Sequence, residues 1–190
     1  MSGSINPRTL PFRAHMTRVL VHGTAANVEV IPRSSSPSAL GNATPRGMGT
    51  VIEGNGVEAW VHFSIRLPRT AEVFLADPSP KADARTFVEY ALIYFTTNDE
   101  NNVESSAQIR EVHIYDGARE IAAYTDLALE GDFSEVRNEL LENANAFKVN
   151  SLIRSALGIS VYVTFGTTLD PPMQPGTITF TAAGADSYLY

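Results

Sequence analysis

Two segments of the chain, 58–65 and 156–165, alternate between apolar and polar side chains, and this alternation constrains the fold more than any other feature. Successive side chains of a β-strand point to opposite faces of the sheet, so a period of two predicts strands with one face in a core. The core-facing positions expected in the first segment are Val61, Phe63 and Ile65. The positions expected on the opposite face are Trp60, His62 and Ser64.

Other segments have the same character. Segment 86–97 would be apolar on both faces of a strand, which predicts a central strand. Segments 109–115 and 120–124 alternate again, and Asp116-Gly117 between them predicts a tight hairpin, because glycine readily adopts the positive φ of such a turn. Shorter strands are expected at 19–21, 27–31, 73–75, 147–149 and 177–182, with a strand or hairpin around Gly23.

Proline, glycine and serine separate these segments. Residues 32–49 are rich in all three and are expected to form a loop that cannot hold a strand ladder. Only 134–145 has helical spacing, with Ser134 as its cap. Eight to ten short strands with at most one short helix predict an all-β fold, an antiparallel β-sandwich or jelly roll.

The chain of 190 residues is long enough for one domain with a substantial core. We expect that domain to span 18–186. Residues 1–17 show no strand or helix period and are expected to form an N-terminal arm, and 187–190 an aromatic C-terminal tail. Apolar side chains in these ends suit contacts with a neighbouring subunit. They are Ile5, Leu10, Phe12, Tyr188 and Tyr190.

Composition excludes several classes of protein. The absence of cysteine excludes disulfides, thiolate nucleophiles and cysteine-ligated metals. A net charge of -7 argues against a nucleic-acid partner. No apolar run approaches the length of a membrane span, and the first 30 residues lack the apolar block of a signal peptide. We expect a soluble protein. The sequence does not identify its compartment, and an extracellular or surface-associated location is one of the alternatives.

Six short motifs along the chain form a combination that is known from other proteins. They are VHG at 21–23, GMG at 47–49, WVHFSIRLP at 60–68, VHIYDG at 112–117, LGISV at 157–161 and AGAD at 183–186. In these motifs the chain resembles a family of small bacterial and fungal all-β proteins of unknown function. The resemblance implies a β-sandwich core and brings no catalytic residue. The arm before Met16 and segment 134–145 depart from the family pattern, and such additions often carry assembly or partner contacts.

Three histidines lie in expected strands: His22, His62 and His113. Three imidazoles and a water can hold zinc or copper, so these residues are candidate metal ligands. The simpler interpretation is three separate residues on outer or edge positions, and we expect no metal and no cofactor.

Trp60, His62 and Tyr115, with Tyr162, would share an outer sheet face if their strands are neighbours. Rings beside polar side chains suit sugar binding, because a pyranose presents C–H groups to a ring and hydroxyls to hydrogen-bonding groups. A carbohydrate-binding module that uses Trp60, His62 and Tyr115 is therefore one functional hypothesis, with a glycan as its partner.

The leading hypothesis from the sequence is a non-enzymatic structural protein. No nucleophile elbow, phosphate-binding loop or dinucleotide fingerprint is present. Charged residues make up 18% of the chain, below the roughly 25% of average soluble domains. A surface of low charge is easier to bury against another copy, so we expect self-assembly into a homo-oligomer through the terminal arm.

Overall fold

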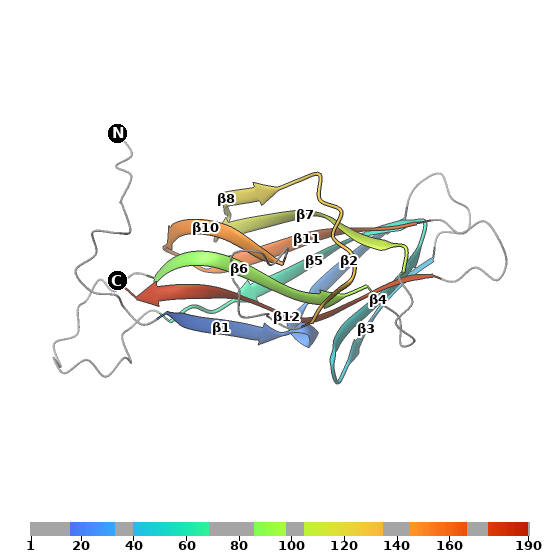
Figure 1. Cartoon of the computed structure of the whole chain (residues 1–190), viewed down its shortest axis with the longest axis horizontal. Coiled ribbons are helices and arrows are strands. Elements are labelled where there is room, and N and C mark those ends of the chain that lie inside the picture. The colour runs from blue at the N-terminus through green and yellow to red at the C-terminus, as the bar shows by residue number, and fades with distance from the viewer. Residues whose placement is uncertain are drawn as a thin grey trace.

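The structure, a computed structural model, describes residues 16–32, 40–68, 86–97, 105–134, 145–166 and 175–189. Two antiparallel sheets pack face to face (Figure 1). Sheet A has seven strands: β1 (Thr17–His22), β3 (Leu40–Arg46), β4 (Gly49–Asn55), β6 (Thr86–Thr96), β9 (Asp132–Phe133), β10 (Ala146–Ile153) and β12 (Gly176–Leu189). Sheet B has five: β2 (Asn27–Pro32), β5 (Val57–Ile65), β7 (Ala107–Asp116), β8 (Arg119–Tyr124) and β11 (Leu157–Phe165). The predicted all-β antiparallel sandwich is confirmed, with more strands than expected.

Helix is nearly absent from the described ranges, where the one helical element is the 3-10 turn η2 (Gly23–Ala25). Within those ranges, no helix has the length and apolar character needed to cross a lipid bilayer. The helical candidate at 134–145 lies almost entirely outside the described residues, as do the expected strand at 73–75 and residues 1–15 of the arm.

The two alternating segments are neighbours in sheet B, whose strand order is β2-β5-β11-β7-β8. β5 and β11 pair along their whole length, with Val61 opposite Val161. Val61 and Val161 are both fully buried, whereas Trp60 and Tyr162 are half-buried. The predicted division of these strands into an inner and an outer face is confirmed.

The core fills the space between the sheets and includes aromatic side chains from both. Phe63 of sheet B lies 5.9 Å from Phe180 of sheet A, measured between ring centroids, and Phe95 lies 6.3 Å from Phe180. Burial of each such side chain contributes about 1.5–3 kcal/mol. The inner faces of both sheets therefore form the packed core.

β6 lies between β10 and β12 in sheet A, so the prediction of a central strand at 86–97 is confirmed. The β7–β8 hairpin is also confirmed, with Gly117 at a φ of +62° in its turn. Asp116 has a second role there, because its carboxylate accepts hydrogen bonds from the backbone N–H groups of Arg154 (3.1 Å) and Ser155 (2.7 Å).

The expected loop at 32–49 is wrong for residues 40–46, which form β3 and pair with β4 across a turn at Gly47 and Met48. Among the described strands β3 is an edge strand, with β4 as its single pairing partner. An edge strand tolerates proline, because an N–H that points away from the sheet is not required, and Pro45 occupies such a strand. Residues 33–39 of the expected loop lie outside the described residues.

The chain does not form a hairpin around Gly23. β1 belongs to sheet A and β2 to sheet B, so the chain crosses between the sheets at η2. A Cβ on Gly23 would lie 1.8 Å from the carbonyl oxygen of Phe180, and Thr50 Oγ1 donates to the Gly23 carbonyl at 3.0 Å. Only glycine allows this crossing to pass so close to β12.

β12 is longer than the strand expected at 177–182. It continues to Leu189, so residues 187–189 belong to sheet A and not to a separate tail, and Asp186 lies inside the strand and not at a loop end. The reason is pairing on both sides: Asp186 lies opposite Tyr90 of β6 and Arg18 of β1. Thr17, expected in the arm, is the first residue of β1.

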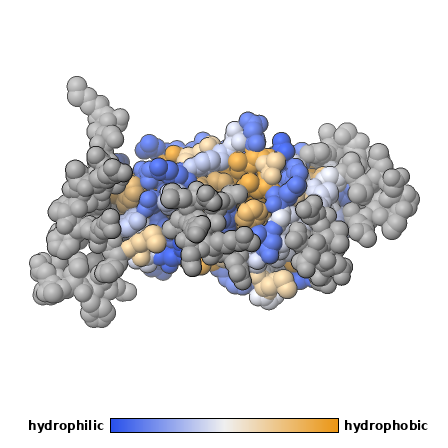
Figure 2. Space-filling model, in the orientation of Figure 1, coloured by the Kyte–Doolittle hydropathy of each residue, from blue (hydrophilic) through white to orange (hydrophobic). Residues whose placement is uncertain are grey.

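Figure 2 shows one face of the molecule, on which hydrophobic patches are set among hydrophilic residues. Four large apolar side chains of the described ranges are exposed: Met16, Leu20, Ile31 and Met48. Scattered exposed apolar residues are normal for a folded domain and do not define a binding surface.

Candidate functional site

The outer face of sheet B carries a cluster of aromatic rings that we name the aromatic face. Its five rings are Trp60, His62, His113, Tyr115 and Tyr162, all half-buried. They come from β5, β7 and β11, the three middle strands of the sheet. Because the opposite parity of each strand is occupied by the core, strand alternation alone turns these rings outward.

The register of the strands sets which side chains are neighbours. Trp60 lies opposite Tyr162, and His62 lies opposite Ser160. Ser160 in turn lies opposite His113, so that Ser160 separates the two histidines. In the next row Tyr115 lies opposite Gly158, which has no side chain. The rings therefore occupy three adjoining rows across the sheet, and in the third row Tyr115 lies beside a glycine.

Trp60 is at the centre of this cluster. Its ring centroid lies 5.0 Å from that of Tyr162 and 5.5 Å from that of His113, the latter with an edge-on angle of 68°. The His62 ring lies 6.2 Å away and nearly parallel, at 8°. Aromatic pairs at such separations contribute about 0.5–1.5 kcal/mol beyond their area burial, so the cluster holds its own rings in place.

The two histidines of the face are fixed by hydrogen bonds. His62 Nδ1 and Ser160 Oγ lie 2.8 Å apart. His113 is held between two carboxylates, with Nδ1 2.7 Å from Glu120 Oε2 and Nε2 2.9 Å from Glu111 Oε2. When His113 is protonated, both of its ring nitrogens donate, one to each carboxylate.

Electrostatics at His113 follow from these contacts. Burial by itself lowers the pKa of His113, and the hydrogen bonds and charges of Glu120 and Glu111 outweigh it, so that the pKa of His113 is raised. Burial and then the Glu120 charge raise the pKa of Tyr115, which keeps this phenol protonated as a hydrogen-bond donor.

We expect His113 to titrate above the ordinary histidine value of about 6.5. Because its folded pKa exceeds its unfolded pKa, His113 stabilises the fold fully below about pH 6.5, and this stabilisation is lost as the pH rises through the folded pKa. NMR titration of the imidazole protons measures this directly. The Glu120→Gln substitution should lower the pKa of His113, whereas Glu53→Gln on sheet A should leave it unchanged. A His113 that titrates at or below 6.5 in the wild type would contradict the pairing.

The three-histidine metal hypothesis is wrong. His22 lies in β1 of sheet A and His62 and His113 lie in sheet B, because the chain crosses between the sheets just after His22. His22 Nδ1 instead contacts Thr24, accepting from its backbone N–H at 3.3 Å. Across the described ranges, no group of three or more histidine, aspartate or glutamate side chains is placed to hold a metal ion.

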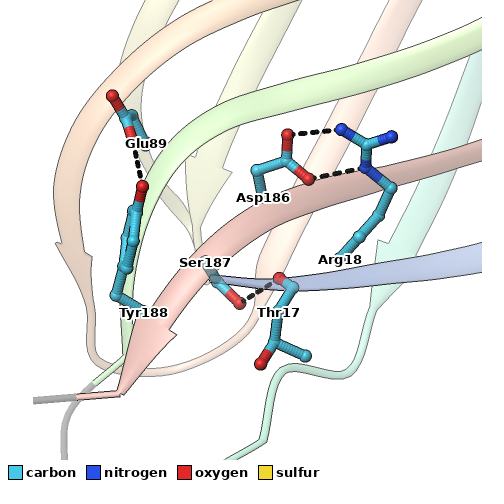
Figure 3. Close-up of polar contacts among 6 residues, drawn as sticks. All are labelled: Thr17, Arg18, Glu89, Asp186, Ser187 and Tyr188. Atoms are coloured by element: carbon cyan, nitrogen blue, oxygen red, sulfur yellow. Dashed lines mark hydrogen bonds and ion pairs between the residues drawn. The ribbon is translucent and has the colours of Figure 1, made fainter. Parts of the chain in front are cut away.

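The expected assembly residues divide into two sets. Tyr188 lies in β12, where its hydroxyl donates to Glu89 Oε2 at 2.7 Å within the same chain (Figure 3). Next to it, Ser187 Oγ donates to the Thr17 carbonyl at 3.1 Å. The remaining residues, Ile5, Leu10, Phe12 and Tyr190, lie outside the described residues.

Glu111 and Glu120 belong to the aromatic face and were not expected there, whereas Ser160 was expected on the outer side of its strand beside Tyr162. Glu120 lies opposite Tyr115 because the hairpin turn falls at Gly117 and Ala118 and the pairing shifts register between Ile114 and Tyr115. Glu111 is harder to predict, because a register shift near Tyr162 of β11 interrupts the pairing around it. Strand alternation counted back from His113 would still have placed it outward.

No model of a known protein family matches the sequence, and no curated protein matches it. Among solved structures, a family 35 carbohydrate binding module from Clostridium thermocellum is similar at 12% sequence identity, over 85% of this chain and 97% of that one, with a TM-score of 0.28. A likeness of this size carries no information on family or ligand. The resemblance to the bacterial and fungal all-β family stays a prediction.

Proposed function

We propose that this β-sandwich is a binding module whose aromatic face takes a carbohydrate. The observation that carries the proposal is the Trp60 cluster: a half-buried indole on an outer sheet face, with Tyr162 5.0 Å and His113 5.5 Å away. Clusters of partly exposed aromatic side chains are unusual on a protein surface, and they are typical of recognition sites.

The chemistry of the face suits a sugar ring. The apolar faces of Trp60 and Tyr162 can receive pyranose C–H groups. Beside them the Ser160 hydroxyl can donate to or accept from a sugar hydroxyl, and the carboxylate oxygens of Glu111 and Glu120 can accept from sugar hydroxyls. All of these side chains are fixed by strands or hydrogen bonds, so that little conformational entropy is lost on binding.

Binding fits the face better than catalysis does. Glu111 and Glu120 are the acidic groups nearest His113, and both are engaged with it at 2.7–2.9 Å. A glycosidase needs one carboxyl group that is free to give up a proton and a second that acts on the sugar, and two carboxylates hydrogen-bonded to the same histidine do not supply that pair. The arrangement orients hydrogen-bonding groups and provides no nucleophile poised for attack.

Self-assembly, the leading hypothesis from the sequence, receives no support from the described residues. Tyr188 is paired within its own chain. The other expected assembly residues lie outside the described ranges, so a homo-oligomer stays a prediction that light scattering of the full chain would test.

The proposal is tested by a panel of immobilised oligosaccharides followed by titration in solution. Trp60 is the only tryptophan of the chain, so its fluorescence reports on the aromatic face alone. We expect one class of glycan to bind, with an affinity in the range of about 1 mM to 1 μM, and to change the intensity or wavelength of this fluorescence. Failure of every glycan on the panel to bind at millimolar concentration would refute the proposal.

A further inference from the structure

The outer face of sheet B is acidic as well as aromatic. Glu29 of β2 lies opposite Trp60 in register, and Glu58 stands two residues before Trp60 on β5. Glu29 points outward, because Val28 and Val30 on either side of it pack against the core. With Glu111 and Glu120, four carboxylates border the rings.

Positive charge on this face is sparse. β2, β5 and β11 contain no lysine or arginine. β7 contributes Arg110, whose Nη1 is directed to Gln108 Oε1 at 3.4 Å, and β8 contributes Arg119 at the hairpin turn. A protonated His113 offsets one charge of the Glu111 and Glu120 pair, and Glu29 lies opposite Trp60 on the neighbouring strand. Among the described side chains of the face, the balance beside Trp60 is therefore negative.

Glu29 is the carboxylate best placed to meet a ligand on Trp60. It is exposed, it lies on the neighbouring strand directly beside the indole, and no described side chain pairs with it. The carboxylates of Glu111 and Glu120 are already hydrogen-bonded to His113. An unpaired carboxylate beside a half-buried indole offers a cation two attractions, one from the carboxylate charge and one from the negative face of the ring.

From this juxtaposition we infer that the aromatic face selects a sugar that carries a protonated amine, such as a β-1,4-linked glucosamine oligomer, over its neutral N-acetylated counterpart. The inference rests on the proposed function and names the substrate class of the same site. The ring of the amino sugar lies on Trp60, and its ammonium group lies within reach of Glu29. A neutral amide at the same position would gain neither the ion pair nor the cation–π contact.

The experiment compares glucosamine tetramer with N-acetylglucosamine tetramer, using Trp60 fluorescence and calorimetry at about pH 6, where a primary amine is protonated. We expect the glucosamine tetramer to bind at least about fivefold more tightly, and the difference to shrink as salt is raised, because exposed charges are screened. Glu29→Gln should weaken binding of the glucosamine tetramer by about two- to fivefold, the range for one exposed ion pair.

Glu53→Gln is the matched control, because it removes the same charge from β4 on the other sheet. It should leave both affinities unchanged. Equal binding of the two tetramers, or equal effects of Glu29→Gln and Glu53→Gln, would overturn the inference while leaving the proposed function intact if other glycans bind. Binding by no glycan at all would overturn both.

Discussion

Replacing Trp60 with alanine should abolish glycan binding and leave the protein folded. Trp60 contacts three other rings of the aromatic face, at 5.0–6.2 Å, so its removal deletes the central surface on which a sugar ring can lie. Truncating the central aromatic residue of a binding site costs 2 kcal/mol or more, which corresponds to about a 30-fold loss of affinity or greater. Calorimetry with the best-binding glycan of the panel measures this loss.

The control for this experiment is Tyr90→Ala. Tyr90 is a half-buried aromatic residue of β6 on the other sheet, so its loss removes a ring without touching the aromatic face. We expect Tyr90→Ala to bind glycan as the wild type does. Equal loss of binding in both variants would indicate a general effect on the fold, and full binding by Trp60→Ala would contradict the role of the aromatic face.

Replacing Arg18 with alanine should destabilise the protein by about 3 kcal/mol, because it leaves the buried carboxylate of Asp186 without its partner. Asp186 is completely buried in β12, and Arg18 of β1 holds it in a two-pronged pair, Nε to Oδ1 at 2.7 Å and Nη2 to Oδ2 at 2.8 Å (Figure 3). We take the lower end of the usual 3–5 kcal/mol range, because the Arg18 side chain is 31% exposed and water can reach the site. Urea denaturation measures the change.

The opposite substitution, Asp186→Asn, should cost less than Arg18→Ala. It removes the buried charge itself, and the guanidinium that loses its partner can turn to water. Arg154→Ala, an exposed arginine in the turn between β10 and β11, provides the control and should change stability by less than about 0.5 kcal/mol. A larger cost for Asp186→Asn than for Arg18→Ala would show that the pair is not what fastens β1 to β12.

Strand alternation predicted the part of the fold that holds the aromatic face. β5 and β11 alternate between core and surface over nine residues each, and one buried face makes such a register unambiguous. The Asp116-Gly117 sequence likewise predicted the hairpin of β7 and β8, whose turn residues are Gly117 and Ala118. These elements were predictable because each depends on local pattern and a single turn.

The rest of the fold depends on partners that are distant in the chain. β3 contains Pro45 and Gly41 and does not read as a strand, yet β4 supplies its pairing partner. β12 reads as a six-residue strand and extends to fourteen, because β1, about 170 residues earlier, and β6 pair with its second half. The assignment of β1 and β2 to different sheets also follows from packing and not from their own sequences.

The candidate site was predictable in part. The parity of Trp60 and His62 placed both on an outer face, and the structure adds Tyr115 and Tyr162 to the same face, as expected if β5, β7 and β11 were neighbours. The order of strands in sheet B decides which residues meet, and the sequence does not contain that order. The pairing of His113 with Glu111 and Glu120, and the position of Glu29 beside Trp60, therefore required the structure.

The most direct test of the central claim is an NMR titration of the isotope-labelled protein with the best-binding oligosaccharide of the panel. We expect the largest chemical-shift changes in the side chains of Trp60, Tyr162 and His62 and in the backbone of β5, β7 and β11. Sheet A should change little, because its outer face lies on the opposite side of the sandwich. Shifts concentrated in sheet A or in loops away from Trp60 would show that the aromatic face is not the binding site.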